Sequence, residues 1–77
     1  MSTEVRLIQW GMGMQEGVVL RWHVAEGAVV AEGDPLVEIE AEKVTADVPA
    51  PVAGTVTSIV AQVGETVPVR GVLALID

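Results

Sequence analysis

The sequence has no cysteine among its 77 residues, and this absence removes several classes of function. Disulfides cannot stabilise the chain, and neither cysteine-based zinc sites nor thiol nucleophiles are available to it. A single histidine, His23, leaves no second imidazole for a histidine-rich metal site. We therefore expect neither a metal centre nor a catalytic thiol.

Basic residues are also scarce, since four lysines and arginines stand against eleven acidic residues and give a formal net charge of −7. Nucleic acids and anionic lipids both attract proteins through lysine and arginine, so neither is an expected partner. No apolar run approaches the roughly 20 residues of a membrane-spanning helix. The N-terminus resembles neither a signal peptide nor a transit segment, so we expect a cytoplasmic location without membrane contact.

Helical periodicity is lacking too, whereas short strand patterns follow one another along the chain. Apolar and polar residues alternate over residues 36–41 and again over 44–48, with only Glu42 and Lys43 between the two runs. This pattern predicts a tight hairpin, and because neither turn residue is Gly or Asn we expect a type I turn. Further strands are predicted at about residues 4–9, 18–24, 55–60 and 72–76.

The chain also contains an internal repeat, because a shift of 37 residues aligns six pairs of identical residues without a gap. The pairs are Gly17 and Gly54, Val19 and Val56, Gly27 and Gly64, Val30 and Val67, Leu36 and Leu73, and Ile39 and Ile76. Each half runs in the same order of glycine, strand, glycine turn, valine and strand. We therefore predict an all-β fold, a flattened β-barrel or sandwich of two four-stranded antiparallel sheets with pseudo-two-fold symmetry. The 42–43 hairpin and the termini are expected at opposite ends.

Lys43 is the only lysine, since the other three basic residues are Arg6, Arg21 and Arg70. Arginine stays protonated under ordinary conditions, whereas a lysine amine can be acylated. A single amine at a hairpin tip would be accessible to a modifying enzyme. A solvated turn lysine is the simpler explanation of the position alone, but the absence of any other lysine favours a functional one.

The two tryptophans and the histidine are expected to be structural. Trp10 and Trp22 are the only aromatic residues, and core packing is the usual role for such side chains. His23 follows Trp22 on a predicted strand, so the two side chains point to opposite faces and His23 should be half exposed.

Several motifs, in a fixed order, cover nearly the whole chain. They read GMQEG at residues 13–17, VAEG at 24–27, PLVEIEAEKV at 35–44, VPAPVAGTV at 48–56 and VGETVPV at 63–69. In these motifs the chain resembles the lipoyl domains of dihydrolipoyl acyltransferases in 2-oxo acid dehydrogenase complexes, such as the pyruvate dehydrogenase complex. The resemblance implies that residues 1–77 are one lipoyl domain, the N-terminal domain of a longer acyltransferase, and not an enzyme by themselves.

By this resemblance Lys43 receives lipoate through an amide bond, as N6-lipoyllysine, from a lipoate ligase or lipoyl transferase. A thiamine-diphosphate 2-oxo acid decarboxylase would reductively acylate the lipoyl group. This swinging arm would then deliver the acyl group to the acyltransferase catalytic core and be reoxidised by dihydrolipoyl dehydrogenase. The domain would be a monomeric carrier without catalytic residues, and tethering would raise the effective concentration of the arm at each site.

The residues on either side of the lysine depart from the family pattern, which most often has Asp before it and Ala after it. Glu42 keeps the negative charge, whereas the bulkier Val44 is expected to alter affinity for partner enzymes. The resemblance also places the loop after the first strand beside the hairpin. The predicted recognition surface therefore comprises Glu42 and Val44 together with five loop residues, Gly11, Met12, Gly13, Met14 and Gln15.

Three other functions remain open. A biotinyl carrier domain usually has Met on both sides of its lysine, which Glu42 and Val44 do not match. An unmodified interaction module, like the lipoyl-like hairpins of membrane-fusion adaptor proteins, fits less well with the Glu-Lys pair and the single lysine. An enzyme would need a group of catalytic residues in a cleft, for which so small a chain has little room.

The glycines at 11 and 13 do not indicate a phosphate-binding loop. Gly11-Met12-Gly13 lacks the further glycine and the helix of such a loop.

Overall fold

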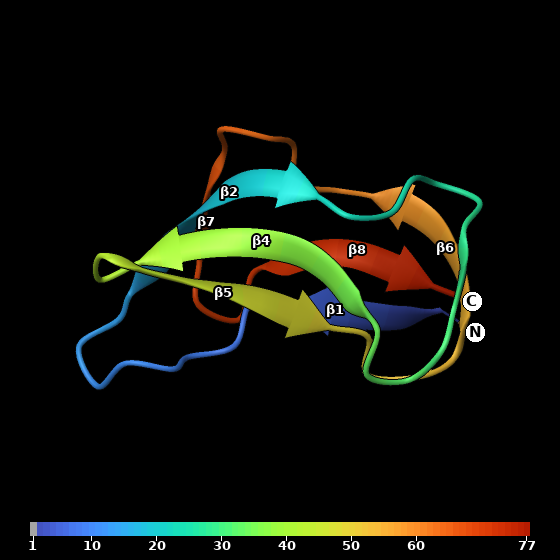
Figure 1. Ribbon diagram of the computed structural model, residues 1–77, viewed down its shortest axis with the longest axis horizontal. Coiled ribbons are helices and arrows are strands. Elements are labelled where there is room, and N and C mark those ends of the chain that lie inside the picture. Colours follow the sequence, from blue (N-terminus) through green and yellow to red (C-terminus); the bar gives the residue numbers. More distant parts are fainter. Residues whose placement is uncertain (1) are drawn as a thin grey trace.

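The computed structural model describes residues 2–77, which form two four-stranded antiparallel sheets and no helix (Figure 1). The strands are β1 Thr3–Arg6, β2 Glu16–Trp22, β3 Val29–Val30, β4 Pro35–Ala41, β5 Val44–Pro49, β6 Gly54–Ile59, β7 Thr66–Pro68 and β8 Val72–Ile76. One sheet has the strand order β1-β8-β6-β3 and the other has the order β5-β4-β2-β7. The predicted all-β sandwich is confirmed. Among the described residues no helix is long and apolar enough to cross a membrane.

Two strands, β3 and β7, fall outside the segments in which the sequence alternates. They are two and three residues long, too short to show a period of two. β1 also ends at Arg6, three residues before its predicted end, after an irregularity in its pairing with β8. The main chain then continues as a loop to Glu16, where β2 begins.

The internal repeat corresponds to a two-fold relation between the sheets. Val19 pairs with Ile39 in one sheet, and Val56 pairs with Ile76 in the other, at the same spacing of 37 residues. Directly after these pairs the register shifts in both sheets, between Val19 and Arg21 on β2 and between Val56 and Ser58 on β6. The strand orders match as well. In the order of the two sheets, β1 corresponds to β5, β8 to β4, β6 to β2 and β3 to β7. The predicted pseudo-two-fold symmetry is confirmed.

The core lies between the sheets and draws on both halves of the repeat. No polar or charged residue among those described is buried. The largest fully buried side chains are Leu7, Leu36, Ile39, Leu73, Ile76, Val5, Val19, Val37, Val48 and Val56. Burial of this apolar surface is the main stabilising contribution to a domain without disulfides.

The tryptophans pack against the margin of this core, as expected. Trp22 donates a hydrogen bond from Nε1 to the carbonyl oxygen of Ala61 at 2.8 Å. The His23 side chain is 24% exposed, and its Nε2 lies 2.9 Å from Oδ1 of Asp47 on β5. The packing predicted for the two tryptophans is confirmed, whereas β2 ends at Trp22, so His23 lies just beyond the strand on which it was expected.

The β4–β5 hairpin tip projects at the end of the molecule opposite the two termini (Figure 1). The loop that follows β1, residues 7–15, lies at the same end as the hairpin tip (Figure 1). This arrangement agrees with the prediction from the repeat and leaves the tip accessible from outside the sandwich.

Candidate functional site

Lys43 lies at the tip of the β4–β5 hairpin, in a turn of two residues. Ala41 pairs with Val44, so only Glu42 and Lys43 lie between the paired positions. Their φ angles are 54° and 62°, both in the left-handed region, as in a type I′ turn. The predicted type I turn is wrong, because that turn has negative φ at both positions. The right-handed twist of the flanking strands favours a type I′ turn. This preference outweighs the ~1–2 kcal/mol that each non-glycine residue costs in the left-handed conformation.

The Lys43 side chain is exposed, and no carboxylate of residues 2–77 forms an ion pair with it. Beside the tip is a shallow, open hollow of about 330 Å³ that Lys43 lines together with Glu16, Glu40 and Glu42. An enzyme that reaches the amine therefore meets a surface on which negative charge predominates. Among the residues that the structure describes, the amine has no partner to release before it reacts.

The loop after β1 packs against this turn through Glu42. A Cβ atom placed on Gly11 would lie 3.6 Å from Cγ of Glu42, and one placed on Gly13 would lie 3.7 Å from its Oε1. The Glu42 side chain thus extends from the hairpin over the two loop glycines. The expected proximity of loop and hairpin is confirmed.

The remaining residues of the predicted recognition surface differ in exposure. Met12 is 100% exposed and Val44 is 53% exposed, so both side chains are free to meet a partner. Met14 is only 2% exposed and belongs to the hydrophobic core. Its backbone N–H donates to the carbonyl of Gly11 at 3.1 Å, and its own carbonyl accepts a bond from Nε2 of Gln9 at 3.1 Å. Met14 therefore anchors the loop, and its side chain offers no outer surface.

A second turn, residues 68–71 between β7 and β8, holds both ends of this loop. Val69 donates its backbone N–H to the carbonyl of Gln15 at 2.9 Å, and Arg70 donates to the carbonyl of Leu7 at 2.8 Å. The sequence interpretation missed this turn as part of the site. The repeat contains a signal for it, since the 37-residue shift aligns Arg70 with Gly33.

A sandwich of two related sheets that presents one lysine on a hairpin tip defines the class of lysine-attachment carrier domains. The family model named Biotin_lipoyl, described as "Biotin-requiring enzyme", matches residues 3–76. The chain belongs to this family.

Similar proteins come from several bacteria. The dihydrolipoyllysine-residue succinyltransferase component of the 2-oxoglutarate dehydrogenase complex of Bartonella vinsonii subsp. berkhoffii is 42% identical over 77 residues, covering 100% of this chain and 19% of the relative. The dihydrolipoyllysine-residue acetyltransferase component of the pyruvate dehydrogenase complex of Acholeplasma laidlawii is 40% identical over 74 residues, covering 96% of this chain and 14% of the relative. The corresponding acetyltransferase component of the acetoin cleaving system of Cupriavidus necator is 40% identical over 68 residues, covering 88% of this chain and 18% of the relative.

This chain spans about a fifth or less of the length of these relatives. The resemblance to the lipoyl domains of dihydrolipoyl acyltransferases is confirmed by the family match and by these relatives.

Proposed function

We propose that this domain is a lipoyl carrier and that Lys43 is its attachment residue. One observation carries the proposal: the only lysine of the chain is exposed in the two-residue turn of the hairpin. The names of the relatives all specify dihydrolipoyllysine, which supports lipoate over biotin. The flanking residues Glu42 and Val44 support the same choice, because biotinyl domains usually have methionines there.

The residues of the turn fit such a group. Lys43 offers an amine that is exposed and unpaired among the described residues, and its four-carbon stem adds reach to any attached chain. The left-handed turn fixes the direction in which this stem leaves the hairpin. The Glu42 side chain lies beside Gly11 and Gly13 of the loop, next to the attachment residue. When bound, lipoate would supply a disulfide that opens to a dithiol and holds an acyl group as a thioester.

We further propose that residues 1–77 are the N-terminal domain of a longer, cytoplasmic acyltransferase chain. Its partners would be a lipoate ligase or lipoyl transferase, a thiamine-diphosphate 2-oxo acid decarboxylase, an acyltransferase core and dihydrolipoyl dehydrogenase. The names of the relatives support the assignment to such complexes. The domain would contribute position and recognition rather than a reacting side chain.

The test is an intact-mass measurement of the domain after incubation with lipoate ligase, ATP and lipoate, with the N-terminal amine blocked. The wild type should gain one lipoyl group, and Lys43→Arg, which retains the positive charge, should gain none. A lipoylated Lys43→Arg variant would refute the assignment. A parallel incubation with biotin ligase, ATP and biotin tests the second candidate, a biotinyl carrier, which the family description favours. Efficient biotinylation with slow lipoylation would establish that candidate instead.

A further inference from the structure

The two halves of the repeat contain the same turn with different residues at its left-handed position. Gly33 in the first half has a φ of 91°, and Arg70, 37 residues later, has a φ of 74°. Gly33 donates its N–H to the carbonyl of Ala50, and Arg70 donates to the carbonyl of Leu7, both at 2.8 Å. The backbone requirement is therefore the same in both halves, but only the first half meets it with glycine.

An arginine at this position is destabilising relative to glycine. For an L-residue at positive φ, the Cβ atom approaches the following carbonyl oxygen, which glycine avoids. The surroundings of this turn do not require glycine, because a Cβ placed on Gly33, the counterpart of Arg70, would meet nothing within 4 Å. Side chains that are kept in strained backbone conformations cluster at functional positions. A function of the Arg70 side chain that offsets this cost is therefore expected.

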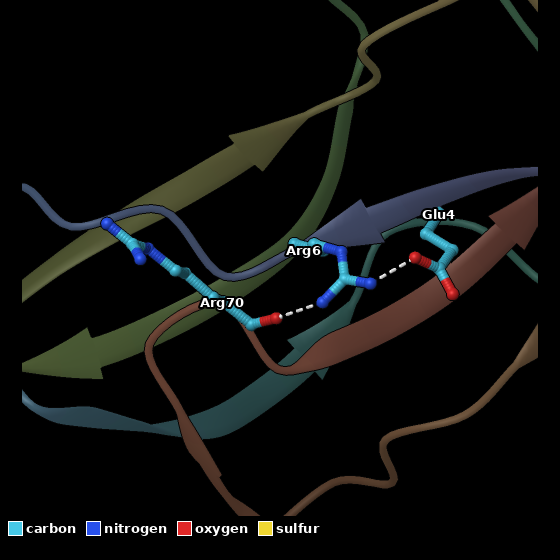
Figure 2. A network of polar contacts seen from close by, with 3 residues as sticks. All are labelled: Glu4, Arg6 and Arg70. Atoms are coloured by element: carbon cyan, nitrogen blue, oxygen red, sulfur yellow. Dashed lines mark hydrogen bonds and ion pairs between the residues drawn. The ribbon is translucent and has the colours of Figure 1, made fainter.

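Among residues 2–77, no hydrogen bond or ion pair provides such a use for the Arg70 side chain. Figure 2 shows Arg6 between the carboxylate of Glu4 and the main-chain carbonyl of Arg70, to which its Nη1 donates at 2.7 Å. The Arg70 guanidinium extends away from this network, and no carboxylate of residues 2–77 pairs with it (Figure 2). Arg21 differs, since its Nε lies 3.4 Å from Oε1 of Glu38. Among the described residues, the hydrogen bonds of Arg70 involve its backbone alone.

Arg70 also borders the predicted recognition surface. Its backbone bonds to Leu7, where the loop begins, and its neighbour Val69 bonds to Gln15, where the loop ends. The same loop lies under Glu42, next to Lys43. The hairpin tip, the loop and Arg70 thus form one continuous side of the domain.

We propose that Arg70 is a partner-recognition residue whose guanidinium pairs with a carboxylate on the decarboxylase that acylates the lipoyl group. This inference rests on the proposed function. The planar guanidinium can donate two parallel hydrogen bonds to a carboxylate, which lysine cannot. On a domain with a net charge of −7, a complementary partner surface is mostly basic, so one acid opposite Arg70 would select a single docking orientation. A decarboxylase that lacks this acid would face an unmatched cation and would be disfavoured.

The test compares Arg70→Gln, Arg70→Gly and Arg70→Lys with the matched control Arg21→Gln, which removes one positive charge elsewhere on the surface. Two purified decarboxylases serve as probes, one specific for pyruvate and one for 2-oxoglutarate. The measurements are the Kd of the unmodified domain and the KM for the lipoylated domain. With the decarboxylase that accepts the wild type better, Arg70→Gln and Arg70→Gly should raise both constants by about two- to fivefold, as for one exposed ion pair. Arg70→Lys should have an intermediate effect, and Arg21→Gln should match the wild type.

The melting temperature separates recognition from a structural role. Arg70→Gly should melt at or above the wild-type temperature, because glycine relieves the left-handed backbone. A lower melting temperature of this variant, an equal loss of affinity in Arg21→Gln, or wild-type behaviour of Arg70→Gln with both enzymes would each overturn the inference. Failure of Lys43 to accept lipoate would refute the proposed function. The Kd of the unmodified domain for a decarboxylase does not depend on lipoylation, so it would still test whether Arg70 contributes to binding. Absence of any binding to either decarboxylase would also count against it.

Discussion

Gly17 on β2 lies so close to Ile39 on β4 that a Cβ atom on the glycine would approach Cγ2 of the isoleucine to 2.5 Å. The second half repeats the relationship, since a Cβ on Gly54 would lie 2.8 Å from Cγ2 of Ile76. Both glycines and both isoleucines are aligned by the 37-residue shift. The same close approach of a glycine to an isoleucine is therefore built into each sheet.

We expect Gly17→Ala and Gly54→Ala to lower the free energy of unfolding by about 1–3 kcal/mol, the usual cost of an added methyl group in a packed core. Gly13→Ala is the matched control, because its Cβ would have no neighbour closer than 3.7 Å. Urea denaturation monitored by tryptophan fluorescence would measure all three variants. If Gly17→Ala unfolds at the same urea concentration as Gly13→Ala, the contact with Ile39 is not limiting.

Long-range patterns in the sequence predicted more than local ones did. The repeat predicted two related sheets, and alternation on both sides of residues 42–43 predicted the hairpin that presents Lys43. Strands β3 and β7 could not be predicted from alternation, because strands of two and three residues are defined by their pairing with β6 and β2. The turn type was missed because neither Glu42 nor Lys43 is typical of a left-handed position, and strand twist decides it. The left-handed backbone of Arg70 becomes apparent only by comparison with Gly33, its counterpart in the repeat.

The left-handed conformation of Glu42 predicts that asparagine is better suited to this position. Asparagine tolerates positive φ and is favoured at the first central position of a type I′ turn. Glu42→Asn should therefore raise the melting temperature, by an amount equivalent to part of the ~1–2 kcal/mol that the left-handed conformation costs. Glu40→Asn makes the same charge change on the neighbouring strand β4, where asparagine has no such advantage. A melting temperature of Glu42→Asn no higher than that of Glu40→Asn would show that the contact of Glu42 with the loop dominates.

Lipoylation of Lys43 should change the formal net charge from −7 to −8, because the amide replaces one ammonium group. On a native gel the modified domain should migrate faster toward the anode than the unmodified domain. Lys43→Arg, treated with the same ligase, should show one band at the unmodified position. Equal mobility of the two wild-type forms, with modification verified by mass, would contradict this expectation.

The two loop methionines should respond differently to truncation. Met14→Ala removes a side chain that is 2% exposed, so it should destabilise the domain by about 2–4 kcal/mol, as other core truncations do. Met12 is 100% exposed, so Met12→Ala should leave the melting temperature within about 2–4 °C of wild type, since surface changes are usually within ±0.5 kcal/mol. Its effect should appear as a modest decrease in the rate of reductive acylation of the lipoylated domain. An unchanged rate would remove Met12 from the recognition surface.

Val44 offers the sharpest test of partner choice, because it adjoins Lys43 and is 53% exposed. Val44→Ala restores the residue most common in the family and removes two methyl groups from the immediate surroundings of the attachment site. The edge position of β5 leaves the fold little affected, so the expected change lies in recognition. Rates of reductive acylation with a pyruvate-specific and a 2-oxoglutarate-specific decarboxylase should shift relative to each other. Because peripheral contacts of this kind contribute about 1 kcal/mol or less, the ratio of the two rates should change by no more than about fivefold. An identical ratio for wild type and Val44→Ala, both fully lipoylated, would mean that the partner does not contact this flank of the lysine.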